Sequence, residues 1–257
     1  MVKGVAVKFN SYKETIPAVL DLIKLPQELK KYSKIILKPS INTQTGKATP
    51  KEALEAVLAY CVYHKNPAAE IFIAEGADGQ NTQELFEHYQ YTQLAELFPV
   101  GLIDLNEAET EEIQDGYFQK FASIHYPKVL LESFVISIPE LSEDPETEIQ
   151  TSLSNMLGAF PSSKYRGFFS RSKTKLRAWP IKYSIHDIVR CKTPNLAIID
   201  ASAQGKIIIG HPLEADKQAA KLLNKDWRSI AHLRLIDDSI AATAKPQKEV
   251  EMPEVEQ

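Results

Sequence analysis

Short runs of apolar, largely β-branched residues recur along the chain, and stretches with helical spacing separate them. Short apolar runs that are flanked by turn residues are typical of buried strands. The pattern predicts strands at residues 2–9, 34–38, 70–74, 101–105, 134–138, 195–200 and 206–209. It predicts helices over 16–23, 50–61, 82–89, 147–156 and 216–223. Strands alternating with helices favour an α/β fold with a mainly parallel sheet and helices on both faces.

The clearest helix signal follows a polar loop at residues 39–48. Thr49 as N-cap, Pro50 at the first helical position and Glu52 at the third form a capping box. The apolar residues after it repeat at helical spacing up to Cys61. We therefore expect a helix that begins at Pro50.

The stretch from Val129 to Gly158 is where the pattern changes most abruptly. The apolar run 134–138 stops at Pro139, and the next residues are acidic and polar. Open α/β sheets bind ligands beyond the carboxyl ends of their strands. The segment 140–155 is therefore the expected place for chemistry, and an ordinary acidic surface loop is the alternative interpretation.

Composition narrows the class of protein. The 257 residues are 44% apolar, enough for one α/β domain at 1–242 or two intimately packed lobes, with a disordered acidic tail at 243–257. A net charge of −4 gives the average surface no attraction for nucleic acid or anionic membranes. With two cysteines and neither a signal peptide nor a long apolar run, we expect a cytoplasmic protein without a membrane partner. The oligomeric state is not predicted.

One segment is strongly basic. Residues 164–192 contain nine Lys or Arg against the single acid Asp187, with five aromatic residues interleaved. We expect a basic, irregular insertion near 159–192. It can pair with acidic segments or cover the mouth of a site, bind a small anion, or stack on single-stranded nucleic acid.

Motifs for well-known chemistry are missing from the sequence. It contains no dinucleotide-binding glycine pattern, phosphate-binding loop or nucleophile elbow. No two of the six histidines are spaced for a shared metal, and two distant cysteines cannot hold a four-thiolate cluster. We therefore expect no metal and no cofactor.

The order of the elements and their local sequence motifs resemble those of the prokaryotic family called domain of unknown function 362. The resemblance runs from about Lys34 to Ala241. The matching residues are Lys38-Pro39, Thr49-Pro50, Glu75-Gly76, the run 102–106, Ser137-Ile138-Pro139, the run 154–158, the run 216–223, the run 226–230 and His232-Leu233. The resemblance implies an α/β fold and the position of a site, but no reaction.

The departures from the family pattern fall in the central stretch. After the strand the family has Pro-Lys-Leu-Lys-Thr-His, whereas this chain has acids or Ser at the corresponding positions, including Glu140, Ser142 and Asp144. Phe134 stands where the family has an Asp, Ser40 where it has an Asn, and Ser154 where it has a Lys. Chemistry that needs those lysines and that imidazole is therefore excluded here.

We expect the sheet edge to bind a small anion, a carboxylate or a phosphate. Lys38 would pair with it, Lys164 or Arg166 would close the mouth, and Lys173 and Lys175 would lie further away. Hydrogen bonds would come from Ser40, Asn42, Thr49 and Asn155.

Two other classes of function stay open. One is an enzyme acting on a small anionic metabolite, with Glu75, Asp200 or Asp216 as general base. The other is a nucleic-acid or protein interaction module that uses the basic segment 164–192.

Overall fold

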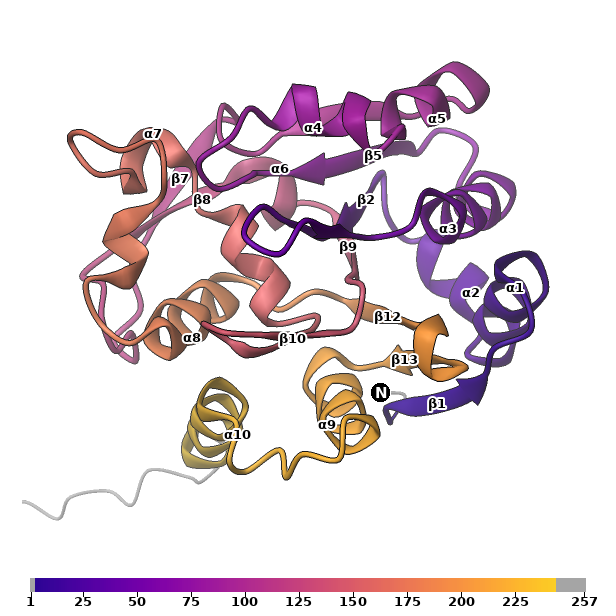
Figure 1. The fold of residues 1–257 in the computed structure, drawn as a ribbon. Helices are drawn as coiled ribbons and strands as arrows, with labels where there is room; N and C mark the ends of the chain where they lie inside the picture. The colour runs from indigo at the N-terminus through magenta and orange to yellow at the C-terminus, as the bar shows by residue number, and fades with distance from the viewer. Residues whose placement is uncertain (1–2, 244–257) are drawn as a thin grey trace, which may run out of the picture.

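A computed structural model of the chain describes residues 3–243 and shows a seven-stranded sheet with helices on both faces (Figure 1). The strand order is β1-β13-β12-β9-β2-β5-β6, and the five strands from β12 to β6 are mutually parallel. β13 runs antiparallel to both of its neighbours. The predicted fold class is confirmed. The sheet strands are β1 Val5–Lys8, β2 Lys34–Pro39, β5 Glu70–Glu75, β6 Gly101–Asp104, β9 Phe134–Ile138, β12 Leu196–Ala201 and β13 Lys206–Gly210.

Three two-stranded ribbons lie outside the main sheet. They pair β3 Ile41–Asn42 with β4 Lys47–Ala48, β7 Thr110–Ile113 with β8 Ile124–Pro127, and β10 Ser142–Asp144 with β11 Glu148–Gln150. The first and third of these ribbons follow β2 and β9, so they stand at the carboxyl ends of the central strands.

The helices divide between the two faces of the sheet. One face packs against α1 Tyr12–Leu22, α2 Leu25–Leu29, α3 Lys51–His64, α4 Thr82–His88 and α5 Tyr91–Leu97. The other is covered by α6 Lys128–Leu131, the 3-10 helix η1 Ser154–Ala159, α7 Ser162–Tyr165, η2 Thr174–Arg177, α8 Ile181–Cys191, α9 Pro212–Leu222 and α10 Ala231–Thr243, while η3 Ser202–Gln204 links β12 to β13. None of the described helices is long and apolar enough to cross a bilayer.

Alternation along the central strands explains this layering. In β2, Ile35 and Leu37 belong to the core beneath α1–α5, whereas Ile36 belongs to the core on the opposite face. Each strand therefore presents apolar side chains to both helical layers, as expected of a parallel sheet covered on both sides. Lys38 continues the alternation on the face of Ile36 but is fully buried.

The predicted helix at 147–156 is wrong. The chain instead turns back on itself as β10 and β11, with Glu148 at a φ of 68°, before η1 begins. Hydroxyl groups cause the difference. Thr147 Oγ1 donates to the carbonyl of Ile149, and Ser154 Oγ accepts from the amide of Thr151. These local bonds compete with the helical hydrogen bonds that the apolar spacing suggested.

Other element boundaries also differ from the predictions. Pro50, not Thr49, is the N-cap of α3, because the Thr49 hydroxyl accepts from the amide of Ser40 instead. α1 begins at Tyr12, where the side chain of Ser11 caps it. The expected irregular basic segment contains a regular helix, α8, whose buried residues include Ile185 and Ile188. The predicted tail lies outside the described residues, except for Thr243 at the end of α10.

Strand order locates the crevice of the sheet. From β2 the chain adds β5 and β6 on one side, and it then crosses to place β9 and β12 on the other. The order of addition reverses beside β2, and a reversal of this kind opens a crevice at the carboxyl ends of the strands.

Candidate functional site

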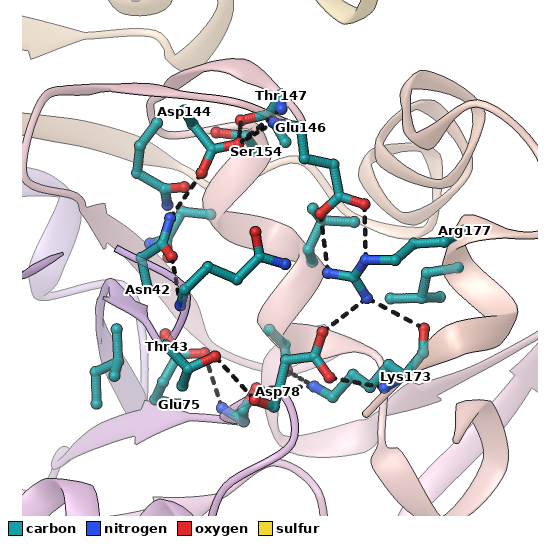
Figure 2. Close-up of a pocket in the computed structure, with 18 residues that line it drawn as sticks. Asn42, Thr43, Glu75, Asp78, Asp144, Glu146, Thr147, Ser154, Lys173 and Arg177 are labelled. Carbon is teal, nitrogen blue, oxygen red and sulfur yellow. Dashed lines mark hydrogen bonds and ion pairs between the residues drawn. The ribbon is translucent and has the colours of Figure 1, made fainter. Parts of the chain in front are cut away.

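A cavity of about 90 Å³ lies at the carboxyl ends of β2 and β5, under η1 and η2. Figure 2 shows its polar side chains converging from these separate elements. The lining residues are Ile41, Asn42, Thr43, Gln44, Glu75, Gly76, Asp78, Asp144, Glu146, Thr147, Gln150, Ser154, Asn155, Leu157, Gly158, Lys173, Leu176 and Arg177. Thirteen of these 18 residues have polar or charged side chains, and Ile41, Leu157 and Leu176 add apolar surface.

Beneath the cavity, Lys38 and Glu75 form a buried ion pair. Lys38 Nζ lies 2.6 Å from Glu75 Oε2, and both side chains are almost completely excluded from solvent. Lys38 also donates to Asn155 Oδ1 at 3.2 Å, and Asn155 Nδ2 donates to the carbonyl of Lys38. Burial lowers the pKa of Lys38, and the charge of Glu75 opposes that change. This pair ties the ends of β2 and β5 to η1.

Gly158 lets η1 pass directly over the pair. A Cβ at this position would lie 1.9 Å from Glu75 Oε1 and 2.7 Å from Lys38 Nζ, closer than any side chain can approach. The carbonyl of Gly158 then points toward a second lysine. A glycine is required here by close approach, not by its backbone angles.

Lys173 is the second buried lysine, at 1% exposure. Its Nζ donates to the carbonyl of Gly76 at 2.7 Å and to that of Gly158 at 3.3 Å. The backbone amide of Lys173 also donates to Asp78 Oδ1, which fixes the start of η2. Burial lowers the pKa of the Lys173 ammonium to about 8, although Glu75 and Asp78 partly offset the loss of hydration. An ammonium has three donors, so one remains for a further acceptor.

Arg177 closes one side of the cavity. Its Nε lies 2.7 Å from Glu146 Oε1 and its Nη2 donates to Glu146 Oε2, while Nη1 contacts Asp78 Oδ2 at 2.7 Å. Figure 2 shows the guanidinium between the two carboxylates. All three nitrogens of the guanidinium are thereby engaged, and the chain after β5 is joined to the turn between β10 and β11.

Asp144 stands on the opposite side and holds the β10–β11 turn. Its Oδ1 accepts from the amides of Glu146 and Thr147 and from the Thr147 hydroxyl. Its Oδ2 accepts from Asn42 Nδ2 at 2.7 Å. The acid that replaces the family's basic pattern is therefore satisfied by four donors from the chain itself.

The hydrogen-bonding residues predicted from the sequence are separated by the structure. Asn42 and Asn155 line the cavity, and Lys38 lies directly under it. Ser40 and Thr49 are buried, but they bond to each other and to the strand ends, not to the cavity. The structure therefore brings Lys38, Asn42 and Asn155 together at the cavity, whereas Ser40 and Thr49 stabilise the loop around it.

Lys164 and Arg166 are exposed and do not line the cavity, whereas Lys173 and Arg177 do. The expected order, with Lys164 and Arg166 at the mouth and Lys173 further away, is wrong. Separation from Gly158 along the chain does not correspond to distance in space here. The segment 166–173 leaves the cavity and returns, so a residue further along the chain lies closer. The signal that could have found Lys173 and Arg177 is Asp78, a carboxylate in the turn after β5.

Of the three candidate bases, Glu75 alone lines this cavity. Asp200 lies in β12, which β9 separates from β2, and it accepts from the Tyr12 hydroxyl and from the amide of Ser202. Asp216 is fully buried, and burial raises its pKa to about 6. It accepts from Thr151 Oγ1, from both Ser152 N and Oγ, and from Leu153 N, so it anchors the chain that leads into η1.

Within residues 3–243, no group of three or more His, Cys, Asp or Glu side chains is arranged to hold a metal ion. The carboxylates of the cavity are spread around its wall and held by Arg177, Asn42 and Lys38. Their arrangement is that of separate anchors for different segments.

A family model described as Domain of unknown function (DUF362) matches residues 35–206, which confirms the resemblance drawn from the motifs. No curated protein matches the chain significantly. The fold is similar to a solved structure titled lactate racemase apoprotein, from Thermoanaerobacterium thermosaccharolyticum, with a TM-score of 0.53 at 15% identity. The match covers 88% of this chain but 58% of that one, so the chain spans little more than half of the larger protein.

Proposed function

The chain belongs to the family of domain of unknown function 362, whose description names no activity, and we propose from its cavity that it binds a small monocarboxylic acid. The observation that carries this proposal is the surroundings of Lys173. Its ammonium faces the cavity with two carbonyl acceptors and one donor to spare. A ligand carboxylate would supply the missing acceptor and the missing negative charge.

The charges of the wall favour a single negative charge on the ligand. Glu75 is paired with Lys38, both Asp78 and Glu146 with Arg177, and Asp144 is held by hydrogen bonds. A phosphate or a di- or tricarboxylate would bring its additional charges against these acids, and like charges at close range are unfavourable. Hydroxyl or amino groups on the ligand would instead find acceptors there.

The size of the cavity sets a limit on the ligand. A volume of about 90 Å³ favours a ligand the size of a short-chain acid. Hydroxy- and amino-substituted short-chain acids meet both the size and the charge requirement. Lactate belongs in the test panel because of its size and charge. The similarity to lactate racemase extends only to the fold and is not a reason for this choice.

Calorimetry and thermal unfolding with a panel of short monocarboxylates, dicarboxylates and inorganic phosphate test the proposal. We expect binding of at least one substituted monocarboxylate, which raises the unfolding temperature by mass action. Lys173→Met should weaken this binding by at least tenfold. The matched control is Lys175→Met, since Lys175 lies two residues away but is exposed.

The pH dependence of binding gives a second readout. Because the pKa of Lys173 is about 8, the ammonium form needed for a carboxylate declines above that pH. The Kd should rise about tenfold per pH unit above pH 8 until the pKa of the complex is reached. Preferential binding of phosphate or dicarboxylates, or binding that survives Lys173→Met, would contradict the proposal.

Catalysis is a second candidate function, and one observation favours it. A lysine with a pKa of about 8 is suited to proton transfer near neutral pH, and Glu75 lies at the same cavity. We would test it by proton NMR of each bound acid in deuterated water. Exchange or turnover that Glu75→Gln abolishes would support the enzyme, and an unchanged spectrum after prolonged incubation would leave binding as the function.

A further inference from the structure

The loop after α7 exposes two adjacent phenylalanines. Phe168 is 95% exposed and Phe169 is 97% exposed, and their rings contact each other edge to face at 4.8 Å. Figure 1 shows the loop after α7 projecting beyond the body of the molecule at its left edge. Large apolar side chains are rarely left so fully in water, and their clustering at one point indicates a contact surface.

The same loop carries unpaired positive charge. Residues 164–182 contain no acid. Lys164, Arg166, Arg171 and Lys175 are all exposed, and across residues 3–243 none of these four forms an ion pair. The tip is therefore apolar at its centre and cationic around it, although the chain as a whole has a net charge of −4.

This arrangement suits an anionic lipid surface better than a nucleic acid. Aromatic side chains that enter the interfacial region of a bilayer need their whole surface free, and flanking Lys and Arg bind the anionic headgroups. A base, in contrast, stacks on one face of a ring beside a groove that follows the nucleic-acid backbone. Here both rings stand clear of the protein at a projecting tip.

We propose that the loop 164–175, with Phe168 and Phe169 at its tip, docks the protein on the surface of an anionic membrane. The two rings enter the headgroup boundary, and the surrounding cations hold the loop there. This departs from the expectation of no membrane partner, which rested on the average charge of the chain and on its lack of a signal peptide and of a long apolar run. The loop ends at η2, whose residues line the cavity, so docking would place the cavity near the membrane surface.

Sedimentation with large unilamellar vesicles tests the proposal. Vesicles of phosphatidylcholine containing about one third phosphatidylglycerol should bind the full chain at low salt, and pure phosphatidylcholine should bind it much more weakly. Phe168→Ala/Phe169→Ala should lower the partition coefficient at least about tenfold. Arg166→Glu/Arg171→Glu should lower it by a similar factor or more.

The matched control is Tyr63→Ala. Tyr63 is also highly exposed, at 84%, but it lies on α3, away from α7 in Figure 1, and its removal should leave vesicle binding unchanged. Failure to bind anionic vesicles, or equal binding by native protein and the double phenylalanine variant, would overturn the proposal. So would binding of a single-stranded oligouridylate in the absence of vesicle binding. None of these outcomes depends on the cavity ligand.

Discussion

The two buried lysines of the cavity have opposite surroundings. Lys38 contacts a carboxylate, Glu75, at 2.6 Å and an amide oxygen, and it lies under the cavity. Lys173 contacts two backbone carbonyls and lines the cavity itself. Burial lowers the pKa of both lysines. The charge of Lys38 is therefore neutralised by Glu75, whereas the charge of Lys173 is stabilised by contact with two carbonyl oxygens.

This difference separates a structural lysine from one available to a ligand. A buried charge without a counter-ion in direct contact costs stability, and perturbed groups of this kind are concentrated at functional sites. Lys38, in contrast, holds three segments together and has an acceptor set within the protein. The comparison predicts that substitution of Lys38 mainly affects folding and substitution of Lys173 mainly affects binding and pH dependence.

Lys38→Met should have the largest effect on stability. It leaves the Glu75 carboxylate buried without its partner, and breaking one side of a buried pair costs about 3–5 kcal/mol. Chemical denaturation at neutral pH would measure the loss. The double variant Lys38→Met/Glu75→Gln removes both charges and should recover a large part of it. If the double variant is as unstable as the single one, the ion pair is not what stabilises this region.

Local patterns were sufficient to predict the fold. Residues such as 34–38 and 134–138 are apolar on both faces, and this pattern is decisive for a central parallel strand. The region 140–160 was predicted poorly. Its conformation depends on backbone amides that donate to the carboxylates of Asp144 and Asp216, and apolar spacing carries no information about those bonds.

Of the residues that line the cavity, Asn42 and Asn155 were expected at a site from the sequence, whereas Lys173 and Arg177 were not. Lys38 lies near the end of β2, Asn42 lies in β3 just after it, and Asn155 lies in η1 after β9, so the order of the strands brings them together. Lys173 and Arg177 arrive through a loop whose return path is set by Asp78. A contact between residues almost one hundred positions apart, made by an irregular segment, has no periodic signature in the sequence.

The pH dependence of stability should show the second largest effect, and it sharpens the comparison at Lys173. Its pKa is about 8 in the folded chain and 10.5 in the unfolded chain. Between these values the unfolded state binds the additional proton, so the free energy of unfolding rises with pH. For Lys173 alone the rise from pH 7.5 to 9.5 is roughly 2 kcal/mol. Below pH 7.5 its contribution is nearly constant.

Lys173→Met should therefore flatten the pH dependence in this window relative to the native protein. Denaturation curves at half-unit pH intervals measure the difference, which cancels the contributions of other groups. Lys175→Met, at an exposed neighbouring position, should retain the native dependence. If Lys173→Met keeps the native pH dependence of the free energy of unfolding, the ammonium of Lys173 in the native protein is hydrated in solution.

The smallest expected effect is at Arg177, which joins the two sides of the cavity. Its side chain is 30% exposed and its partners Asp78 and Glu146 are 26% and 23% exposed, so water screens both ion pairs. Arg177→Gln should lower the free energy of unfolding by about 1 kcal/mol. Arg190→Gln is a matched control, because Arg190 forms a similarly exposed pair with Asp115 at 2.7 Å.

The two arginine variants should differ in ligand binding. Arg177 lines the cavity and Arg190 does not. We therefore expect both variants to lose a comparable amount of stability, but only Arg177→Gln to bind the ligand more weakly. Calorimetry with the best monocarboxylate of the panel, below the unfolding transition of both variants, measures this. Equally weakened ligand binding in both variants would mean that binding follows global stability. The distinction drawn between Lys173 and Lys38 would then concern folding energetics alone.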